Sequence, residues 1–160
     1  MSDRLRFRHV LDAGDPEKIR ALIEATGVFT VEEADVAARL AETTLDGSET
    51  YRWLLCDQGD KLAGYTCFDR IELTQGSFDL YWIAVLPELG GKGLGLDLMA
   101  RTAKFIRSKR GTQVFAETSS REPYEKARRF YVKAGFDEVA RFEDFYEPGD
   151  AKVIYRLKLA

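Results

Sequence analysis

The length, composition and charge of the chain exclude several classes of protein. Its 160 residues are enough for one domain with a sizeable core, and a hydrophobic content of 45% excludes an intrinsically disordered chain. A net charge of −3 argues against nucleic acid or an anionic membrane as the main partner. No apolar run approaches the roughly 20 residues of a membrane span, and the N-terminal residues lack the apolar core of a signal peptide, so we expect a cytoplasmic protein.

The cysteines and the histidine predict no metal site. Cys56 and Cys67 are too few and too far apart to bind zinc, and in a reducing compartment we expect both to be buried thiols. His9 is the single histidine and falls in a predicted strand, where a lone histidine is most often structural. The chemistry of this chain is therefore expected to need no metal.

The first half of the chain predicts two helices among strands. Asp15 is expected to cap a helix over 16–25, and Thr30, with Glu33 three residues on, forms a capping box before a helix over 31–44. Period-two alternation and turn residues predict strands at 4–9, 51–57 and 61–74.

The second half alternates strands and helices. Helices are expected at 94–110, stopped by Gly111, and from Pro123 to Gly135, and strands at 78–86, 113–117, 136–146 and 151–159. The element order is then β, αα, βββ, α, β, α, ββ, within one domain over 1–160. Because hairpins are mixed with βα crossovers, we expect an α/β protein with a mixed sheet.

The stretch 79–99, DLYWIAVLPELGGKGLGLDLM, predicts an anion site. A buried strand leads through a glycine-rich loop to the start of a helix, where free N–H groups and the helix dipole favour an anion. Lys92 is followed by Gly93, not by Ser or Thr, which excludes the phosphate loop of nucleotide hydrolases, and Leu98 breaks the dinucleotide pattern GxGxxG.

The sequence GGKGLG at 90–95 resembles the acetyl-coenzyme A signature of the GNAT acyltransferases, (Arg/Gln)-x-x-Gly-x-(Gly/Ala). Gly93 and Gly95 match its two small positions, whereas Gly90 stands where the family usually has Arg or Gln. A second stretch resembles the C-terminal helix motif of the same family, through Ala127, Phe130, Tyr131, Lys133, Gly135 and Phe136. The predicted element order matches the GNAT fold from first strand to last.

This resemblance implies acetyl-CoA as the acyl-donor co-substrate and suggests which residues bind it. The main chain at Ile83 and Val85 would hold the pantetheine and acetyl end, and the loop residues Gly90, Gly91, Lys92, Gly93, Leu94, Gly95 and Leu96 would hold the phosphates. Tyr124 stands where many relatives have an Asn that contacts the pantetheine arm; it could stack on or hydrogen-bond the cofactor, or simply pack at the helix start. Tyr131 lies near the thioester sulfur in the family. Arg128 and Arg129 lie on the same helix and could reach phosphates, although exposed helical arginines are usually just solvated.

The reaction that the resemblance implies needs an acid and a base. Tyr131 is the favoured acid for the leaving thiolate, the alternative being that it only packs or hydrogen-bonds coenzyme A. Asp79 is the favoured base, directly or through water, because alternation puts it on the face of Ile83 and Val85. Glu72 and Glu117 remain weaker candidates, since acids at strand ends are commonly just exposed.

We therefore expect an N-acetyltransferase that moves an acetyl group to a primary amine of a small molecule or peptide by direct attack. The alternatives are a non-catalytic acyl-CoA-binding sensor or complex subunit, and an interaction domain without cofactor. Fold analogy suggests that the acceptor pocket is lined by Phe29, Tyr51, Arg70, Phe145 and Tyr146. The resemblance leaves a homodimer open.

Overall fold

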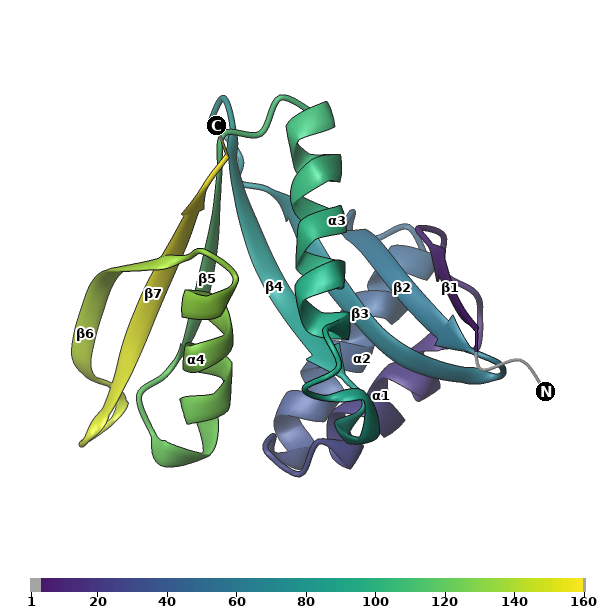
Figure 1. Ribbon diagram of the computed structural model, residues 1–160, viewed down its shortest axis with the longest axis horizontal. Coiled ribbons are helices and arrows are strands. Elements are labelled where there is room, and N and C mark those ends of the chain that lie inside the picture. Colours follow the sequence, from purple (N-terminus) through teal and green to yellow (C-terminus); the bar gives the residue numbers. More distant parts are fainter. Residues whose placement is uncertain (1–3, 160) are drawn as a thin grey trace. The chain divides into compact units, whose positions relative to one another are not determined.

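The structure is a computed structural model that describes residues 4–159, which form seven strands and four α-helices (Figure 1). The strands are β1 Leu5–Arg8, β2 Arg52–Gln58, β3 Lys61–Arg70, β4 Ser77–Val85, β5 Gln113–Ser119, β6 Asp137–Glu147 and β7 Asp150–Lys158. The helices are α1 Asp15–Ala25, α2 Val31–Leu45, α3 Leu94–Ser108 and α4 Glu125–Lys133, with short 3₁₀ helices η1 at Pro87–Leu89 and η2 at Glu122–Tyr124. This order confirms the predicted one.

The strand order is β1-β2-β3-β4-β5-β7-β6, and the sheet is mixed, as predicted. Strands β4 and β5 pair in parallel, while the pairs β1–β2, β2–β3, β5–β7 and β6–β7 are antiparallel. None of the helices within residues 4–159 has the length and apolar character needed to cross a membrane.

The described residues divide into two compact units. The first runs to Asp69 and includes Trp82–Thr102, and the second consists of Arg70–Tyr81 and the chain from Ala103 on. Strand β4 and helix α3 therefore each contribute residues to both units, and the glycine loop belongs to the first.

In the first unit, helices pack on both faces of the sheet. A Cβ atom at Gly64 of β3 would lie 2.9 Å from Leu98 Cδ1 of α3, so strand and helix approach more closely than a side chain would allow. On the other face the indole N–H of Trp53 donates to the Thr44 hydroxyl near the end of α2, at 3.2 Å. Cys56 is one of two buried free thiols in this unit, as predicted.

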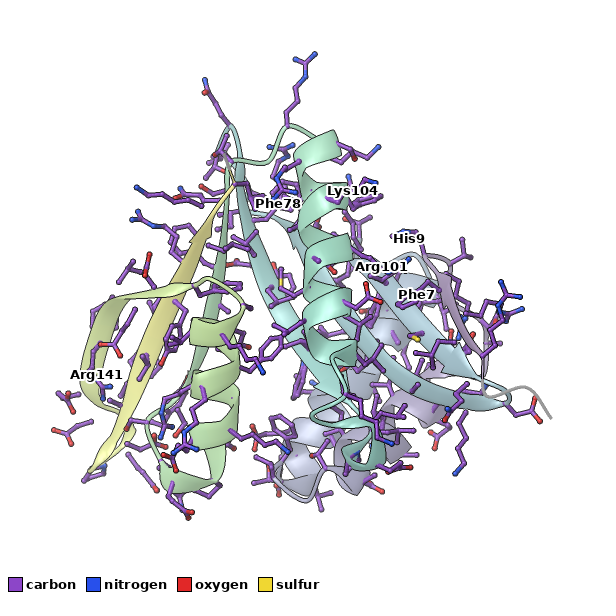
Figure 2. All side chains as sticks on the ribbon, in the orientation of Figure 1. Phe7, His9, Phe78, Arg101, Lys104 and Arg141 are labelled. Atoms are coloured by element: carbon purple, nitrogen blue, oxygen red, sulfur yellow. The ribbon has the colours of Figure 1, made fainter. Side chains whose placement is uncertain are left out.

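The edge strand β1 is fixed to its neighbours by arginines. Figure 2 shows Arg101 of α3 reaching toward Phe7, and its guanidinium carbon lies 3.7 Å from the ring centroid. Arg8 binds two buried carboxylates at once: its Nε donates to Asp57 of β2 at 2.7 Å, and its Nη1 to Asp15 of α1 at 2.7 Å. The sheet edge and the start of α1 are thus joined through one guanidinium.

The prediction that Asp15 caps α1 is wrong, because Arg8 takes its carboxylate. Gly14 is the N-cap residue and makes no side-chain cap bond, and Asp15 is the first residue of the helix with 0% exposure. By contrast, the capping box of Thr30 and Glu33 is present in full at the start of α2 and confirms that prediction.

Strand β3 is shorter than predicted and ends at Arg70, not at 74. Leu73 takes a φ of 64°, a left-handed conformation that a strand cannot include. The Thr74 hydroxyl donates to the Ile71 carbonyl at 2.7 Å, which stabilises a turn in place of a strand end.

Helix α3 ends before Gly111, and the left-handed residue after it is Arg110, with a φ of 65°. Gly111 serves close packing instead, because a Cβ atom there would lie 2.1 Å from Ile106 Cγ2. In the same second unit, α4 packs on the face of β7 that carries Tyr155 (Figure 1). The Tyr131 ring centroid of α4 lies 5.4 Å from that of Tyr155.

Candidate functional site

The glycine loop before α3 has the backbone path of a ligand cradle. Gly91 and Gly93 have φ angles of 76° and 87°, and no heavy atom lies within 4 Å of a Cβ built on either. Only glycine adopts such angles without strain, and the open space leaves the backbone accessible. Gly90 has φ −64° and ψ 141°, angles that any residue adopts. A glycine in place of the usual Arg or Gln therefore removes a side chain here without altering the backbone.

Backbone N–H groups are left open at the start of α3. The N–H groups of Gly91 and of residues 93–96 donate to no acceptor within the described part of the chain, and the first main-chain bond is from Asp97 N–H to the Gly93 carbonyl at 3.0 Å. A helix N-terminus with several free donors carries about half a positive charge, which stabilises phosphate groups. The loop therefore fits a ligand with a phosphate or pyrophosphate group.

A cavity of about 290 Å³ opens beside this loop in the first unit. It is lined by Leu5, Gln58, Leu89, Lys92, Gly93, Leu94 and Asp97. Lys92 adds a positive charge beside the open N–H groups. Ile83 and Val85 lie half-buried in the part of β4 that belongs to this unit. Their predicted main-chain contacts to the pantetheine arm stay predictions.

Tyr131 lies in the second unit, buried to 8% exposure among aromatic rings of α4, β7 and Phe136, which precedes β6. Burial, and then the neighbouring Tyr155, raise the pKa of Tyr131 well above its ordinary value of 10.0. Its hydroxyl makes no hydrogen bond to the described residues. A phenol in this setting keeps its proton at neutral pH, and its O–H can donate a hydrogen bond to a ligand.

The other candidate cofactor residues of α4 differ in what they already bind. Tyr124 is half-buried at the N-cap position of α4. Arg128 donates from Nη1 to the carbonyls of Ser119 and Arg121, at 2.7 and 2.8 Å, and so holds the β5–α4 connection. Arg129 is exposed and pairs with a carboxylate one turn earlier. Their phosphate contacts stay predictions, and the geometry gives Arg128 a structural role as well.

Two of the three candidate bases share one face of the sheet in the second unit. Asp79 of β4 pairs with Phe115 of β5, which puts Asp79 on the same face as Glu117 two residues on. Burial raises the pKa of Asp79, and the charge of Glu117 raises it further. Glu72 lies instead in the exposed turn after β3. Asp79 is thus the half-buried carboxylate, which suits a base near neutral pH.

Sequence reasoning missed Lys152, whose ammonium lies 2.9 Å from Glu117 Oε2. The pair joins β7 to β5, and these strands are separated by a helix and a further strand in sequence. Only the cross-strand register brings Lys152 to the carboxylates, so no local signal in the sequence could have identified it.

The residues proposed from fold analogy for the acceptor pocket fall in both units. In the first, Phe29 makes an edge contact with Trp82 at 5.2 Å between centroids, and Tyr51 is half-buried. In the second, Arg70 donates to backbone carbonyls and covers the Phe78 ring at 4.8 Å. The exposed rings of residues 145 and 146 contact each other on β6. Their role in acceptor binding stays a prediction.

Comparisons with known proteins identify what this arrangement resembles. The sequence profile of the acetyltransferase (GNAT) family matches residues 17–136. A crystal structure of a protein from Desulfovibrio desulfuricans assigned to the GNAT family of acetyltransferases is 41% identical, with a TM-score of 0.94 over 98% of this chain and 100% of that one. A search of curated protein sequences finds no match.

Two more distant structures share the fold. YncA from Salmonella typhimurium, solved with its cofactor acetyl-CoA, is 17% identical with a TM-score of 0.70, over 98% of this chain and 94% of that one. An aminoglycoside 6′-N-acetyltransferase complexed with coenzyme A is 13% identical with a TM-score of 0.76, over 97% of both chains.

Proposed function

The chain belongs to the GNAT family of acetyltransferases, and on this premise we propose that it moves the acetyl group of acetyl-CoA to a primary amine of a small molecule or peptide. The glycine loop carries the proposal: Gly91 and Gly93 take left-handed angles with no heavy atom within 4 Å of a built Cβ, so a pyrophosphate can approach the N–H groups that the start of the helix leaves free. Two distant relatives of the same fold hold acetyl-CoA or coenzyme A, which supports the choice of ligand.

In this proposal the cofactor contacts are those that the family resemblance implies. Backbone N–H groups of the loop 90–96 bind the pyrophosphate, and Lys92 adds a positive charge. Main-chain groups of Ile83 and Val85 hold the pantetheine and acetyl end, and a backbone N–H near the end of β4 stabilises charge on the carbonyl oxygen. Tyr124 and Arg128 hold further parts of the cofactor.

Bound acetyl-CoA supplies a thioester whose carbonyl carbon an amine nitrogen can attack while the sulfur leaves. Asp79 prepares that attack by taking the ammonium proton, directly or through water. Tyr131 donates its hydroxyl proton to the leaving sulfur, and the second proton lost by the nitrogen restores the phenol. Burial raises the pKa of Tyr131, so the phenol holds its proton at neutral pH and gives it to the thiolate only as the nitrogen proton replaces it.

The proposal is tested by measuring thiol release from acetyl-CoA with a panel of primary amines. For the best acceptor, Tyr131→Phe should lower kcat by about 100-fold or more, the range of a lost general acid. Tyr155→Phe is the matched control, since it removes the neighbouring hydroxyl of the same aromatic cluster, and it should leave kcat nearly unchanged. Equal effects of the two variants would refute the acid role of Tyr131.

The competing reading is an acyl-CoA-binding sensor or complex subunit without catalysis. Its specific support is Gly90, where the family's usual Arg or Gln side chain is missing, and Tyr124 in place of Asn. It predicts binding of acetyl-CoA with no thiol release for any amine in the panel. Size-exclusion chromatography of the same samples tests whether the chain forms the homodimer that the family resemblance leaves open.

A further inference from the structure

The face of the second unit's sheet opposite α4 carries a three-charge cluster. Asp79 on β4 and Glu117 on β5 lie on this face, and Lys152 on β7 completes it. The register pairs Glu117 with Ile154, so Lys152, two residues earlier on β7, projects to the same side. Tyr155, on the other side of β7, packs against α4.

Lys152 is held in place from two directions. Its ammonium lies 2.9 Å from Glu117 Oε2 and 4.7 Å from the centroid of the Phe145 ring on β6. The Lys152 side chain is only 21% exposed, whereas that of Glu117 is 58% exposed. An ammonium fixed between a carboxylate and an aromatic face, on a largely covered stem, has a defined position and not the many rotamers of a surface lysine.

The cluster makes its two carboxylates chemically different. Glu117 is bound to the ammonium, and of the charged groups on this face Glu117 on β5 and Lys152 on β7 act on the pKa of Asp79. Arg156 also lies on this face of β7, in the same cross-strand row as Asp79. Burial and Glu117 favour a proton on Asp79, and Lys152 opposes them. Where two acids sit close together, such a difference decides which of them exchanges the proton.

We propose that Lys152 is a positioning residue that assigns the roles of the two carboxylates: it keeps Glu117 as the ion-paired anion and leaves Asp79 as the group that takes the amine proton. The inference rests on the proposed function, since it refines which carboxylate is the base. The transferred proton goes from the ammonium to the Asp79 carboxylate, and Lys152 and Glu117 keep their charges throughout.

The first test needs no turnover. In protein labelled with ¹³C at aspartate carboxyl groups, the Asp79 resonance is assigned by its loss in Asp79→Asn and followed from pH 3 to pH 9. Lys152→Met keeps the stem over Phe145 but removes the charge, so the Asp79 midpoint should move to higher pH. Glu117→Gln removes the opposing charge, so the midpoint should move to lower pH.

Two further variants control the titration. Lys158 lies on the same strand and face, and Lys158→Met changes the net charge equally. It should shift the Asp79 midpoint less than Lys152→Met does, because Lys152 and not Lys158 is the lysine whose charge acts on Asp79. Lys152→Arg keeps the charge and should restore the wild-type midpoint. A midpoint unchanged in both Lys152→Met and Glu117→Gln, or shifted as far by Lys158→Met, would overturn the proposal.

The second test uses the enzyme with its best amine. In Lys152→Met the acidic limb of the plot of kcat/KM against pH should move to higher pH, as the Asp79 midpoint does. In Lys152→Arg the limb should lie at the wild-type pH. A limb that stays in place while the Asp79 resonance moves would refute Asp79 as the base. An enzyme without turnover on any amine would refute the proposed function, while the titration would still decide the role of Lys152.

Discussion

Replacing Arg8 by methionine removes the cation between two buried carboxylates. Asp15 is 0% and Asp57 5% exposed, and losing one partner of a buried ion pair costs about 3–5 kcal/mol. Each carboxylate keeps one weaker partner: the Asp12 N–H lies 2.7 Å from Asp15, and Arg6 lies 3.3 Å from Asp57. We therefore expect the lower end, about 3 kcal/mol, which lowers Tm by about 6–12 °C in a chain of this length.

The assay is thermal and urea unfolding at pH 7, with Arg6→Met as the matched control. The Arg6 side chain is 76% exposed and its ion pair with Asp57 is longer, so its loss should cost less than about 1 kcal/mol. Arg8→Lys keeps the charge but cannot bind both carboxylates through a planar fork, so it should fall between wild type and Arg8→Met.

The loss in Arg8→Met should also depend on pH. Hydrogen bonds from Arg8 hold the pKa of Asp57 below its ordinary value of 3.8. The stability that Asp57 gains from Arg8 is therefore present above pH 3.8 and is lost as the pH falls through the folded-state pKa. The gap between wild type and variant should therefore be full at pH 7 and shrink in acid. A gap below 1 kcal/mol at pH 7, or one that widens in acid, would refute this account of Arg8.

Three further changes have expected outcomes. Gly111→Ala should cost about 1–3 kcal/mol because its Cβ would collide with Ile106. Gly14→Ala, with no atom within 4 Å of its Cβ, should cost less than about 1 kcal/mol in urea unfolding, the difference between glycine and alanine at an N-cap. Thr30→Ala should cost about 1 kcal/mol by removing the side-chain cap of α2, as measured by thermal melting. Asp79→Asn should raise Tm at pH 7, because a raised carboxyl pKa makes the ionised form costly in the folded state; a gain that persists well below pH 3.8 would contradict this, since the group is then protonated in both states.

The parts of the fold that local sequence controls were predicted correctly. The capping box of Thr30 depends on Glu33 three residues on, and the turn at 58–60 connects strands that are neighbours in sequence. Asp15 has an equally good local signal as a cap, yet Arg8 on another element takes its carboxylate. Arg110, not Gly111, takes the left-handed position after α3, because Gly111 is needed for contact with Ile106.

In the candidate site too, features set by consecutive residues are predictable from the sequence, and features set by strand register are not. The anion site at the glycine loop follows from consecutive residues, a strand, four glycines and a helix start, and so is legible in the sequence. The left-handed angles of Gly91 and Gly93 come from the structure. The sequence predicts only the two carboxylates of the charge cluster around Asp79. Glu117 was a candidate base, but Lys152 is brought to it by the β5–β7 register, which a single sequence does not reveal.

Ligand-dependent melting tests most directly whether the loop before α3 binds acetyl-CoA. At 100 times its dissociation constant acetyl-CoA should stabilise the wild type by about 2.7 kcal/mol, a rise in Tm of about 5–10 °C. Gly93→Glu puts a strained, negatively charged residue at a φ of 87°, and Gly47→Glu is the matched control at a φ of 81° with equally open space. Both variants should melt lower without ligand by a similar amount. Gly47→Glu should keep the acetyl-CoA shift and Gly93→Glu should lose it. An absent shift in the wild type, or an equal shift in both variants, would contradict acetyl-CoA binding at this loop.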